Sequence, residues 1–373
     1  MSYFRDIEEE ERWYRQTLNG PTRTGLISKF LGSFWAKFVA FAVASFVVFS
    51  WDVPYVILHP TVPVNILGED NGTDILEVVG HASYPTDGAL ALTAVSFEGS
   101  RENPPSLYQL LAALVDPKTK IYNVDVIEPV FDGPQVNVPS GNDIRQSENA
   151  ARAMVLRRLG ISFKTRVFVN GVYTEAPAWG SLEGGDYIET FNGHPVRTET
   201  ELRQMVQASG NARNVQLGIE RDGQKKLVKI KLAKYQDSYF MGILPGEKYA
   251  FPFKIKITLT DLDGPSAGLM FALSIYDELT PGNLTGGERF SGTGTISQYG
   301  TVGAIGGIRQ KMIGAADAGY KYFFAPAPNC SEVVGNVPAG LRVFKIRTFD
   351  DALRVIDTVT SRGNIDTLPT CTN

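Results

Sequence analysis

The segment that most constrains this chain lies near its N-terminal end. From Phe38 to Trp51 it holds no charged residue, and the apolar run continues past Asp52 to Leu58. Residues 38–58 number 21, and a helix of about 20 apolar residues crosses the hydrocarbon core of a bilayer. A buried core helix would normally alternate polar and apolar faces, and this segment does not. The sequence therefore predicts an N-terminal transmembrane helix over residues 38–58.

The residues around this segment favour an uncleaved anchor over a signal peptide. A signal peptide begins with a few basic residues, whereas here 37 residues come first and include the acidic run Glu8–Glu11. Arg23, Lys29 and Lys37 precede the segment, and no lysine or arginine follows until after Ser100. Positive charge stays on the cytoplasmic side. We therefore expect a single-pass protein of the cell membrane, with residues 1–37 in the cytoplasm and everything beyond about residue 60 outside it.

Composition excludes several classes of partner. The net charge of −4 gives no general attraction to nucleic acid. No G-x-x-x-x-G-K-[ST] pattern is present, so the sequence contains no sign of a P-loop ATPase. A structural zinc site takes about four ligands, and the two cysteines, Cys330 and Cys371, lie far from the three histidines. The sequence predicts no metal and no cofactor.

The sequence pattern changes over residues 161–235. The stretch "APAWGSLEGGDYIETFNGHPV", with its hairpin-type turn Asn192-Gly193, precedes a predicted helix, Glu199–Ala208. This block resembles PDZ domains. Such domains bind an extended peptide as an added strand, so the resemblance implies a peptide ligand. We expect its groove between the first strand, near residues 161–165, and the helix 199–208.

One serine is a candidate nucleophile. The stretch Gly264-Pro265-Ser266-Ala267-Gly268 fits the pattern G-x-S-x-G, and a helix is predicted from Ala267 onward. A serine hydroxyl needs a base, but all three histidines precede Ser266, which excludes the order found in α/β-hydrolases. His81 is the one histidine left as a base, and it is a poor candidate.

Lysine is the other kind of base, provided that burial keeps its amine neutral. On a helix from Ile308 to Gly319, Lys311 falls on the apolar side, whereas Arg309 and Asp317 lie on the opposite face. A lysine in an apolar stripe can instead extend its amine to water. Paired with Ser266, it is a candidate general base.

Three short motifs follow one another along the chain: "DGPSAG" at 263–268, "GTGTI" at 292–296 and "GGIRQK" at 306–311. In order and spacing they resemble the Lon-type Ser–Lys proteases. The resemblance implies that Ser266 is the nucleophile, Lys311 is the general base, and the hydroxyl of Thr293 helps to hold the lysine. Supporting positions implied in the same way are Asp263, Gly264 and Ala267.

The resemblance extends toward the N-terminus. A helix is predicted over Ser147–Gly160, with Ser147 as its N-cap. The stretch "DIRQSENAARAMVLRRLGI" (143–161), which contains it, and the strand-like "GALALTAVSF" (88–97) resemble early elements of Lon-type domains. The fold class is therefore α+β, with a PDZ domain inserted into a mixed α/β protease domain. The predicted boundaries are a linker at 59–74, protease at 75–160, PDZ at 161–235, protease at 236–362, and a C-terminal tail at 363–373.

These inferences combine into one functional hypothesis with two alternatives. The chain is predicted to be an ATP-independent, membrane-anchored, extracytoplasmic serine endopeptidase that cleaves unfolded or extended proteins. A non-catalytic PDZ adaptor or chaperone, or an amidohydrolase of small amides, is the alternative. Resemblance to Lon-type domains implies a ring, with a hexamer as the plausible size.

The two cysteines add a further expectation. Both follow the predicted anchor, so both would face an oxidising compartment. A bond between Cys330 and Cys371 would tie the polar tail "GNIDTLPTCTN" to the protease domain. Two free thiols are the alternative.

Overall fold

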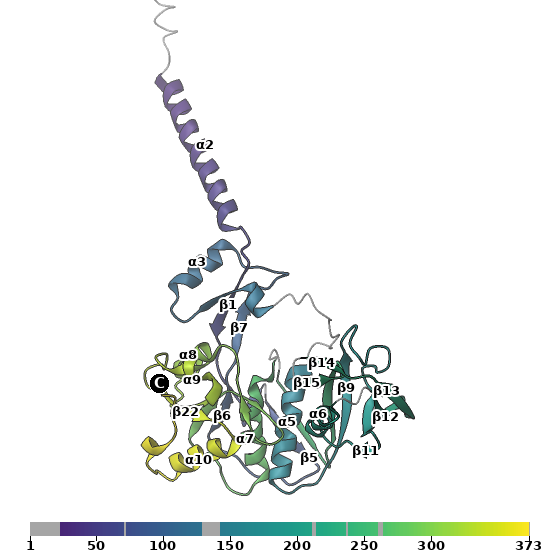
Figure 1. Cartoon of the computed structure of the whole chain (residues 1–373). Helices are drawn as coiled ribbons and strands as arrows, with labels where there is room; N and C mark the ends of the chain where they lie inside the picture. The colour runs from purple at the N-terminus through teal and green to yellow at the C-terminus, as the bar shows by residue number, and fades with distance from the viewer. Residues whose placement is uncertain are drawn as a thin grey trace, which may run out of the picture.

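The computed structural model describes residues 23–70, 72–128, 142–210, 214–235, 238–259 and 264–372. Its parts are a central mixed sheet between helices, a second sheet with its own core, a small three-stranded sheet and a long N-terminal helix (Figure 1). The predicted site residue Asp263 lies outside the described residues.

The central sheet has five strands in the order β2-β6-β18-β21-β22, and β2 alone is antiparallel to its neighbour. Two of the strands precede the PDZ-like block in the sequence and three follow it. The strands are β2 (Val64–Asn65), β6 (Ala89–Leu92), β18 (Arg289–Gly292), β21 (Tyr322–Pro326) and β22 (Arg342–Ile346). One sheet is therefore built from segments on both sides of the block.

Helices cover both faces of this sheet. Alternate residues of a strand point to opposite faces, so Phe324 packs with one layer and Phe323 with the other. The first layer contains α5 (Asn142–Arg158), α7 (Gly268–Leu279) and α10 (Phe349–Thr360). The second contains α8 (Ile308–Asp317) and α9 (Cys330–Val333). The predicted helix from Ile308 is confirmed, and the motifs that contain Ser266 and Lys311 lie on helices at opposite faces of one sheet.

The second sheet has the order β13-β12-β10-β9-β16, with β11 paired to β10. Its own core holds Val167, Ile188, Leu202 and Leu217. The elements are β9 (Lys164–Val172), β10 (Tyr187–Phe191), β11 (His194–Pro195), α6 (Glu199–Ala208), β12 (Val215–Arg221), β13 (Gln224–Ile230) and β16 (Ile243–Ala250). A hairpin of β14 (Ala233–Tyr235) and β15 (Ser238–Phe240) precedes β16. The sheet therefore extends past residue 235, where the sequence places the end of the block.

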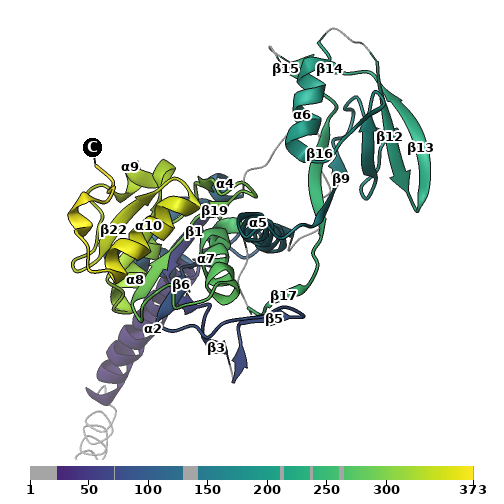
Figure 2. The ribbon, with the colours of Figure 1, turned by 90° about the horizontal axis from the view of Figure 1, so that it is seen from below.

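This second unit joins the central domain through two adjacent connections, the end of α5 and the start of β17 (Lys254–Ile257) (Figure 2). Strand β17 pairs with β5 (Leu76–Val79), which belongs to the part of the chain before the block. Phe163 and Phe251 flank the two connections, and their rings contact each other with centroids 5.2 Å apart.

The N-terminal region corrects one prediction. Helix α2 (Arg23–Phe49) projects away from the rest of the protein (Figure 1), and its described side chains are mostly exposed. Among the residues that the structure describes, no helix is both long and apolar enough to cross a membrane. The predicted helix over 38–58 is wrong beyond Phe49, because Tyr55–Pro60 forms strand β1. Val56, Ile57 and Leu58 are buried there, and β-branched residues suit a packed strand.

Strand β1 is the centre of the three-stranded sheet, between β7 (Val95–Glu98) and β8 (Lys120–Asn123). Helices α3 (Leu107–Val115) and α4 (Val124–Ile127) accompany this sheet. The predicted strand "GALALTAVSF" is thus divided: β6 enters the central sheet and β7 pairs with β1.

The predicted linker at 59–74 is also wrong, because it contains structure and core. Strand β2 lies in the central sheet, Ile66 is fully buried, and β3 (Glu69–Asp70) pairs with β4 (Thr73–Asp74). The tail at the other end is packed too. It includes a 3₁₀ turn, Ile365–Thr367, and Leu368 lies buried in the hydrophobic core.

Candidate active site

Ser266 lies in a short 3₁₀ turn, η1 (Pro265–Ala267), which leads directly into α7. Gly264, before the turn, has a φ of 91°, a left-handed conformation that favours glycine. Helix α7 is almost wholly buried, and Ala267 at its start is only 8% exposed. The serine itself is half-buried. A rigid buried helix therefore fixes the position of a partly accessible hydroxyl.

Lys311 reaches this hydroxyl from the opposite face of the sheet. Its Nζ lies 2.8 Å from Ser266 Oγ and donates to Thr293 Oγ1 over 3.1 Å. The lysine is only 3% exposed, so the prediction that it faces the apolar side of α8 is correct. Burial lowers the pKa of Lys311 to about 8. A substantial fraction of this amine is therefore neutral near physiological pH.

The end of strand β18 holds the backbone of the serine. Thr293 Oγ1 donates to the carbonyl oxygen of Ser266 over 3.1 Å, and the amide of Gly294 donates to the same oxygen over 2.8 Å. Thr293 is fully buried. One threonine hydroxyl thus contacts both the lysine amine and the serine backbone, which orients the two groups toward each other.

Helix α5 provides a contact that the sequence reasoning missed. The helix begins at Asn142, so Ser147 lies inside it and is not its N-cap. Ser147 is 5% exposed, and its hydroxyl donates to the carbonyl oxygen of Pro265 over 2.9 Å. Ser147 shares a helix face with the buried Ala151 and Met154. That spacing is the sequence signal that would have placed the serine against the core.

Gly268 makes this close approach possible. A Cβ atom on Gly268 would lie 2.7 Å from Ser147 Oγ and 2.9 Å from the amide of Ile296. Helix α5, helix α7 and the strand β19 (Thr295–Ile296) therefore meet at a point that only glycine fits.

The histidines take no part in this arrangement. His81 stacks on Phe253 with ring centroids 4.4 Å apart, and His59 pairs with Glu98 over 2.8 Å. His194 is exposed on β11. In the part of the chain that the structure describes, no group of three or more His, Cys, Asp or Glu residues could hold a metal ion. The group beside Ser266 Oγ is Lys311.

A second candidate site is an apolar cavity of about 1390 Å³ beside the second sheet. Helix α6 contributes Leu202 and Val206, and the start of β16 with the residues before it contributes Met241 and Ile243. Residues 161–165, along which the groove was predicted, do not line this cavity. Strand β9 begins at Lys164, and β16 is the strand that occupies the edge of the sheet beside α6.

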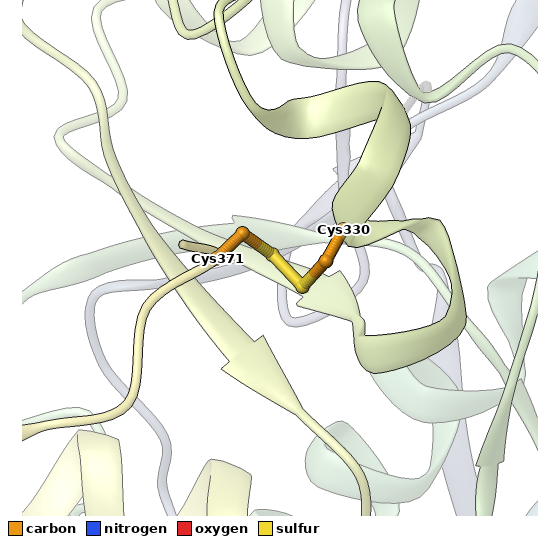
Figure 3. The surroundings of a disulfide bond; sticks show 2 residues. All are labelled: Cys330 and Cys371. Carbon is orange, nitrogen blue, oxygen red and sulfur yellow. A yellow bond between two sulfur atoms is a disulfide. The ribbon is translucent and has the colours of Figure 1, made fainter. Parts of the chain in front are cut away.

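Cys330 and Cys371 form a disulfide, with their Cα atoms 5.0 Å apart (Figure 3). Close to the bond, the amide of Lys345 in β22 donates to the carbonyl oxygen of Pro369 over 2.9 Å. The C-terminal residues are thus attached to the central sheet by a covalent bond and by backbone pairing.

Comparison with protein families agrees with this geometry. Residues 257–359 match the family model of the Lon protease (S16) C-terminal proteolytic domain. This match contains Ser266, Thr293 and Lys311. The chain therefore contains a Lon-type serine peptidase domain. Residues 144–232 match the family model of the PDZ domain.

Individual relatives match part of this chain. A Lon protease of Azospirillum brasilense is 35% identical over 98 residues, which cover 26% of this chain and 12% of that protein. A Lon protease of Fusobacterium nucleatum is 34% identical over 100 residues, which cover 26% of this chain and 13% of that protein. This chain thus spans a small part of the length of these Lon proteases.

Among solved structures, the PDZ domain of an SdrC-like protein from Listeria innocua is 23% identical, covers 21% of this chain and 92% of that chain, and has a TM-score of 0.21. The presence of a PDZ domain rests on the family model and not on this likeness.

Proposed function

We propose that this protein is an ATP-independent endopeptidase of unfolded or extended polypeptides, with Ser266 as nucleophile and Lys311 as general base. The observation that carries the proposal is the 2.8 Å distance between Ser266 Oγ and the Nζ of a lysine that is only 3% exposed. A neutral amine at hydrogen-bond distance from a hydroxyl is the arrangement that general-base catalysis requires.

The reaction follows from these positions. The neutral amine of Lys311 takes the proton of Ser266 as its oxygen attacks the scissile carbonyl carbon, and the resulting ammonium then protonates the leaving amine. Water next attacks the acyl-enzyme, with Lys311 again acting as base, and the serine hydroxyl is restored. Thr293 contacts the lysine and the serine backbone, and so keeps the lysine amine and the serine hydroxyl in position relative to each other.

Backbone amides of η1 after Pro265, which itself has no N–H, are the candidate oxyanion donors. Amides in the first turn of a helix have no partner within that helix, and the helix dipole there favours negative charge. Two preorganised donors would stabilise the tetrahedral intermediate. Unfolded chains are the proposed substrates because no P-loop pattern for an unfolding motor is present in the sequence.

The PDZ domain is proposed to select substrates or a regulatory peptide through the groove between β16 and α6. An extended peptide adds to the free edge of a sheet by main-chain hydrogen bonds, and pockets beside that edge bind and select its side chains. The placement of this domain as an insert is supported by the protease core, which contains residues from before the PDZ match (Leu90, Leu92) and after it (Leu269, Phe344).

We place the protease domain outside the cytoplasm, attached to a membrane through its N-terminal segment. The apolar run in the sequence and the exposed aromatic residues of α2, such as Phe38 and Phe46, support attachment. The Cys330–Cys371 disulfide supports an oxidising compartment. Protease accessibility of the intact cell surface, with and without membrane solubilisation, tests both points. Assembly into a ring, with a hexamer as the expected size, is proposed from resemblance to Lon-type domains.

Labelling with an active-site serine reagent tests the proposed chemistry. The full-length protein should be labelled on Ser266, as located by mass spectrometry, and should cleave casein without ATP and in the presence of a zinc chelator. Cleavage of small amides without cleavage of casein would favour the amidohydrolase instead. An inert adaptor would be neither labelled nor active, and the intact Ser266–Lys311 pair argues against it.

A further inference from the structure

A second cavity lies on the same edge of the PDZ sheet. The apolar groove described above lies beside the start of β16, whereas a cavity of about 710 Å³ lies beside its end, at Lys248, Tyr249 and Ala250. Helix α6 lines both cavities, the first through Leu202 and Val206 and the second through Glu201 and the N-cap residue Thr198. One extended chain on the edge of β16 would therefore pass both cavities in turn.

The second cavity is rich in positive charge. Five cationic side chains line it, against one carboxylate, that of Glu201. The five are Arg157, Lys164, Arg166, Arg197 and Lys248. The oxygen Oε2 of Glu201 accepts the backbone amide of Arg197 over 2.8 Å. The cavity thus carries more positive than negative charge.

Most of these cations have no carboxylate partner of their own. Arg166 is the exception, since it pairs with Glu220 and Glu189. Lys248 lies over the rings of Phe168 and Tyr187, with Nζ 5.0 and 5.3 Å from their centroids. Within the described residues, Arg157, Lys164, Arg197 and Lys248 have no carboxylate within ion-pair distance.

Arg157 extends the basic surface to the protease domain. Its guanidinium lies 5.1 Å from the centroid of Phe163 and 5.5 Å from that of Tyr299, and it donates to the carbonyl oxygen of Gln298. These are neutral partners. A ligand that leaves the PDZ edge at the end of β16 would therefore meet a further uncompensated cation on the domain that holds Ser266.

We infer that the ligand of the PDZ groove is a peptide with two parts: an apolar end in the first cavity and an acidic segment, rich in Asp or Glu, in the second. The inference rests on the proposed function of this groove and adds the charge of its ligand. Strand β16 has eight residues, a length of about 26 Å. A peptide of roughly eight residues in extended form matches that length.

The ligand is inferred to be a peptide rather than a small anion, because the edge of β16 can form main-chain hydrogen bonds with an added strand. Strand β16 is the last strand of the sheet and pairs with β9 on one side, so its other side offers main-chain groups to an added strand. Charged side chains near the rim of such a site set selectivity and association rate. The cations should thus discriminate between acidic and neutral peptides that share one apolar end.

Two ten-residue fluorescent peptides test this inference, identical except for three glutamates or three glutamines outside a common apolar end. Binding is measured by anisotropy to the full chain carrying Ser266→Ala, which prevents cleavage. The Glu peptide should bind at least about fivefold more tightly at low salt, and the advantage should shrink at high salt because exposed charges are screened. Equal affinities, or no binding of either peptide, would overturn the inference.

Two double variants test whether the cations of the second cavity cause the preference for the Glu peptide. The double variant Arg197→Gln, Lys248→Gln should lose the preference for the Glu peptide and still bind the Gln peptide as the parent does, which also shows that it is folded. The control Lys226→Gln, Lys229→Gln removes two exposed lysines from β13, at the opposite edge of the sheet, and should keep the preference. A preference that survives in the first variant refutes the assignment.

Casein cleavage by the unmodified protein separates this inference from the proposed function. If casein is cleaved but the two peptides bind equally, the acidic segment is wrong and the peptidase stands. If the Glu peptide is preferred but casein is not cleaved, the proposed activity is wrong and the ligand class stands.

Discussion

The catalytic centre and the PDZ groove are built on different principles. At the catalytic centre, side chains from both faces of the central sheet meet in a buried place, where Lys311 and Thr293 are each only 3% exposed or less. At the groove, an edge strand and one helix leave an open apolar cavity beside backbone groups. Chemistry needs particular side-chain atoms at fixed distances, whereas strand addition needs a free edge.

This difference explains why the two sites respond differently to change. A substitution at the catalytic centre removes an atom that takes part in the reaction, and no neighbouring group replaces it. Main-chain contacts at the groove survive most side-chain substitutions. The following experiments separate the two regions, beginning with the variant that should affect only one of them.

Ser266→Ala should give the largest effect. The variant loses the nucleophilic oxygen, so kcat should fall by roughly 10⁴-fold or more, while peptide affinity at the PDZ groove stays unchanged. Casein cleavage and peptide anisotropy on the same preparation measure both. A variant that keeps substantial cleavage would contradict the role of Ser266, and one that loses peptide binding would show that the regions are not separable.

Lys311→Arg should be nearly as severe, with a loss of about 10²–10⁴-fold, because a guanidinium stays protonated and cannot act as base. The pH profile sharpens this prediction. The active form has a neutral Lys311, and burial lowers its pKa to about 8. Below that pH, kcat/KM should rise about tenfold per pH unit and then level off. Peptide affinity should not follow this curve, and a flat kcat/KM between pH 6 and 8 would refute the lysine base.

Loss of the disulfide should affect stability more than catalysis. The bond joins residues 41 apart in sequence, for which the chain-entropy model gives about 3–4 kcal/mol. The double variant Cys330→Ser, Cys371→Ser should therefore unfold at lower urea concentration, with little change in kcat. Thiol counting on the denatured, unreduced parent is the control, and two free thiols there would refute the bond.

Ser147→Ala should give the smallest effect. Its hydroxyl holds the carbonyl oxygen of Pro265, and a hydrogen bond of this kind contributes about 1 kcal/mol. We expect kcat to fall roughly three- to tenfold with KM unchanged. Ser274→Ala is a matched control, because Ser274 is also fully buried but its hydroxyl has no partner among the described residues. Equal effects of the two variants would reduce Ser147 to a packing residue.

The structure brings together the two residues that the sequence singles out, Ser266 and Lys311, but the sequence did not predict the contact of Ser147. Ser266 and Lys311 could be paired because few residue types can serve as a nucleophile or as its base. The helical spacing around Lys311 predicts that it lies on a buried face. The sequence does not predict the apolar cavity beside β16, because strand pairing at an edge leaves little trace in side chains and β16 follows the PDZ-like block. An apolar run such as Val56, Ile57 and Leu58 fits a buried helix and a buried strand equally, so the sequence does not distinguish β1 from a helix. A serine before an apolar helical pattern is typical of an N-cap, but α5 begins five residues before Ser147.

The insertion also sets an order of assembly. Strand β6 pairs with β18, although Ala89 and its partner Arg289 are 200 residues apart in the chain. At about 5–20 residues per second, a ribosome needs roughly 10–40 s to make that length. All strands of the PDZ sheet lie within this interval, and its most distant pair, Lys164 with Ala250, is 250 − 164 = 86 residues apart, so that domain can fold first. The central sheet, which needs β18 beside β6, can close only later, so the protease fold is completed after the PDZ domain.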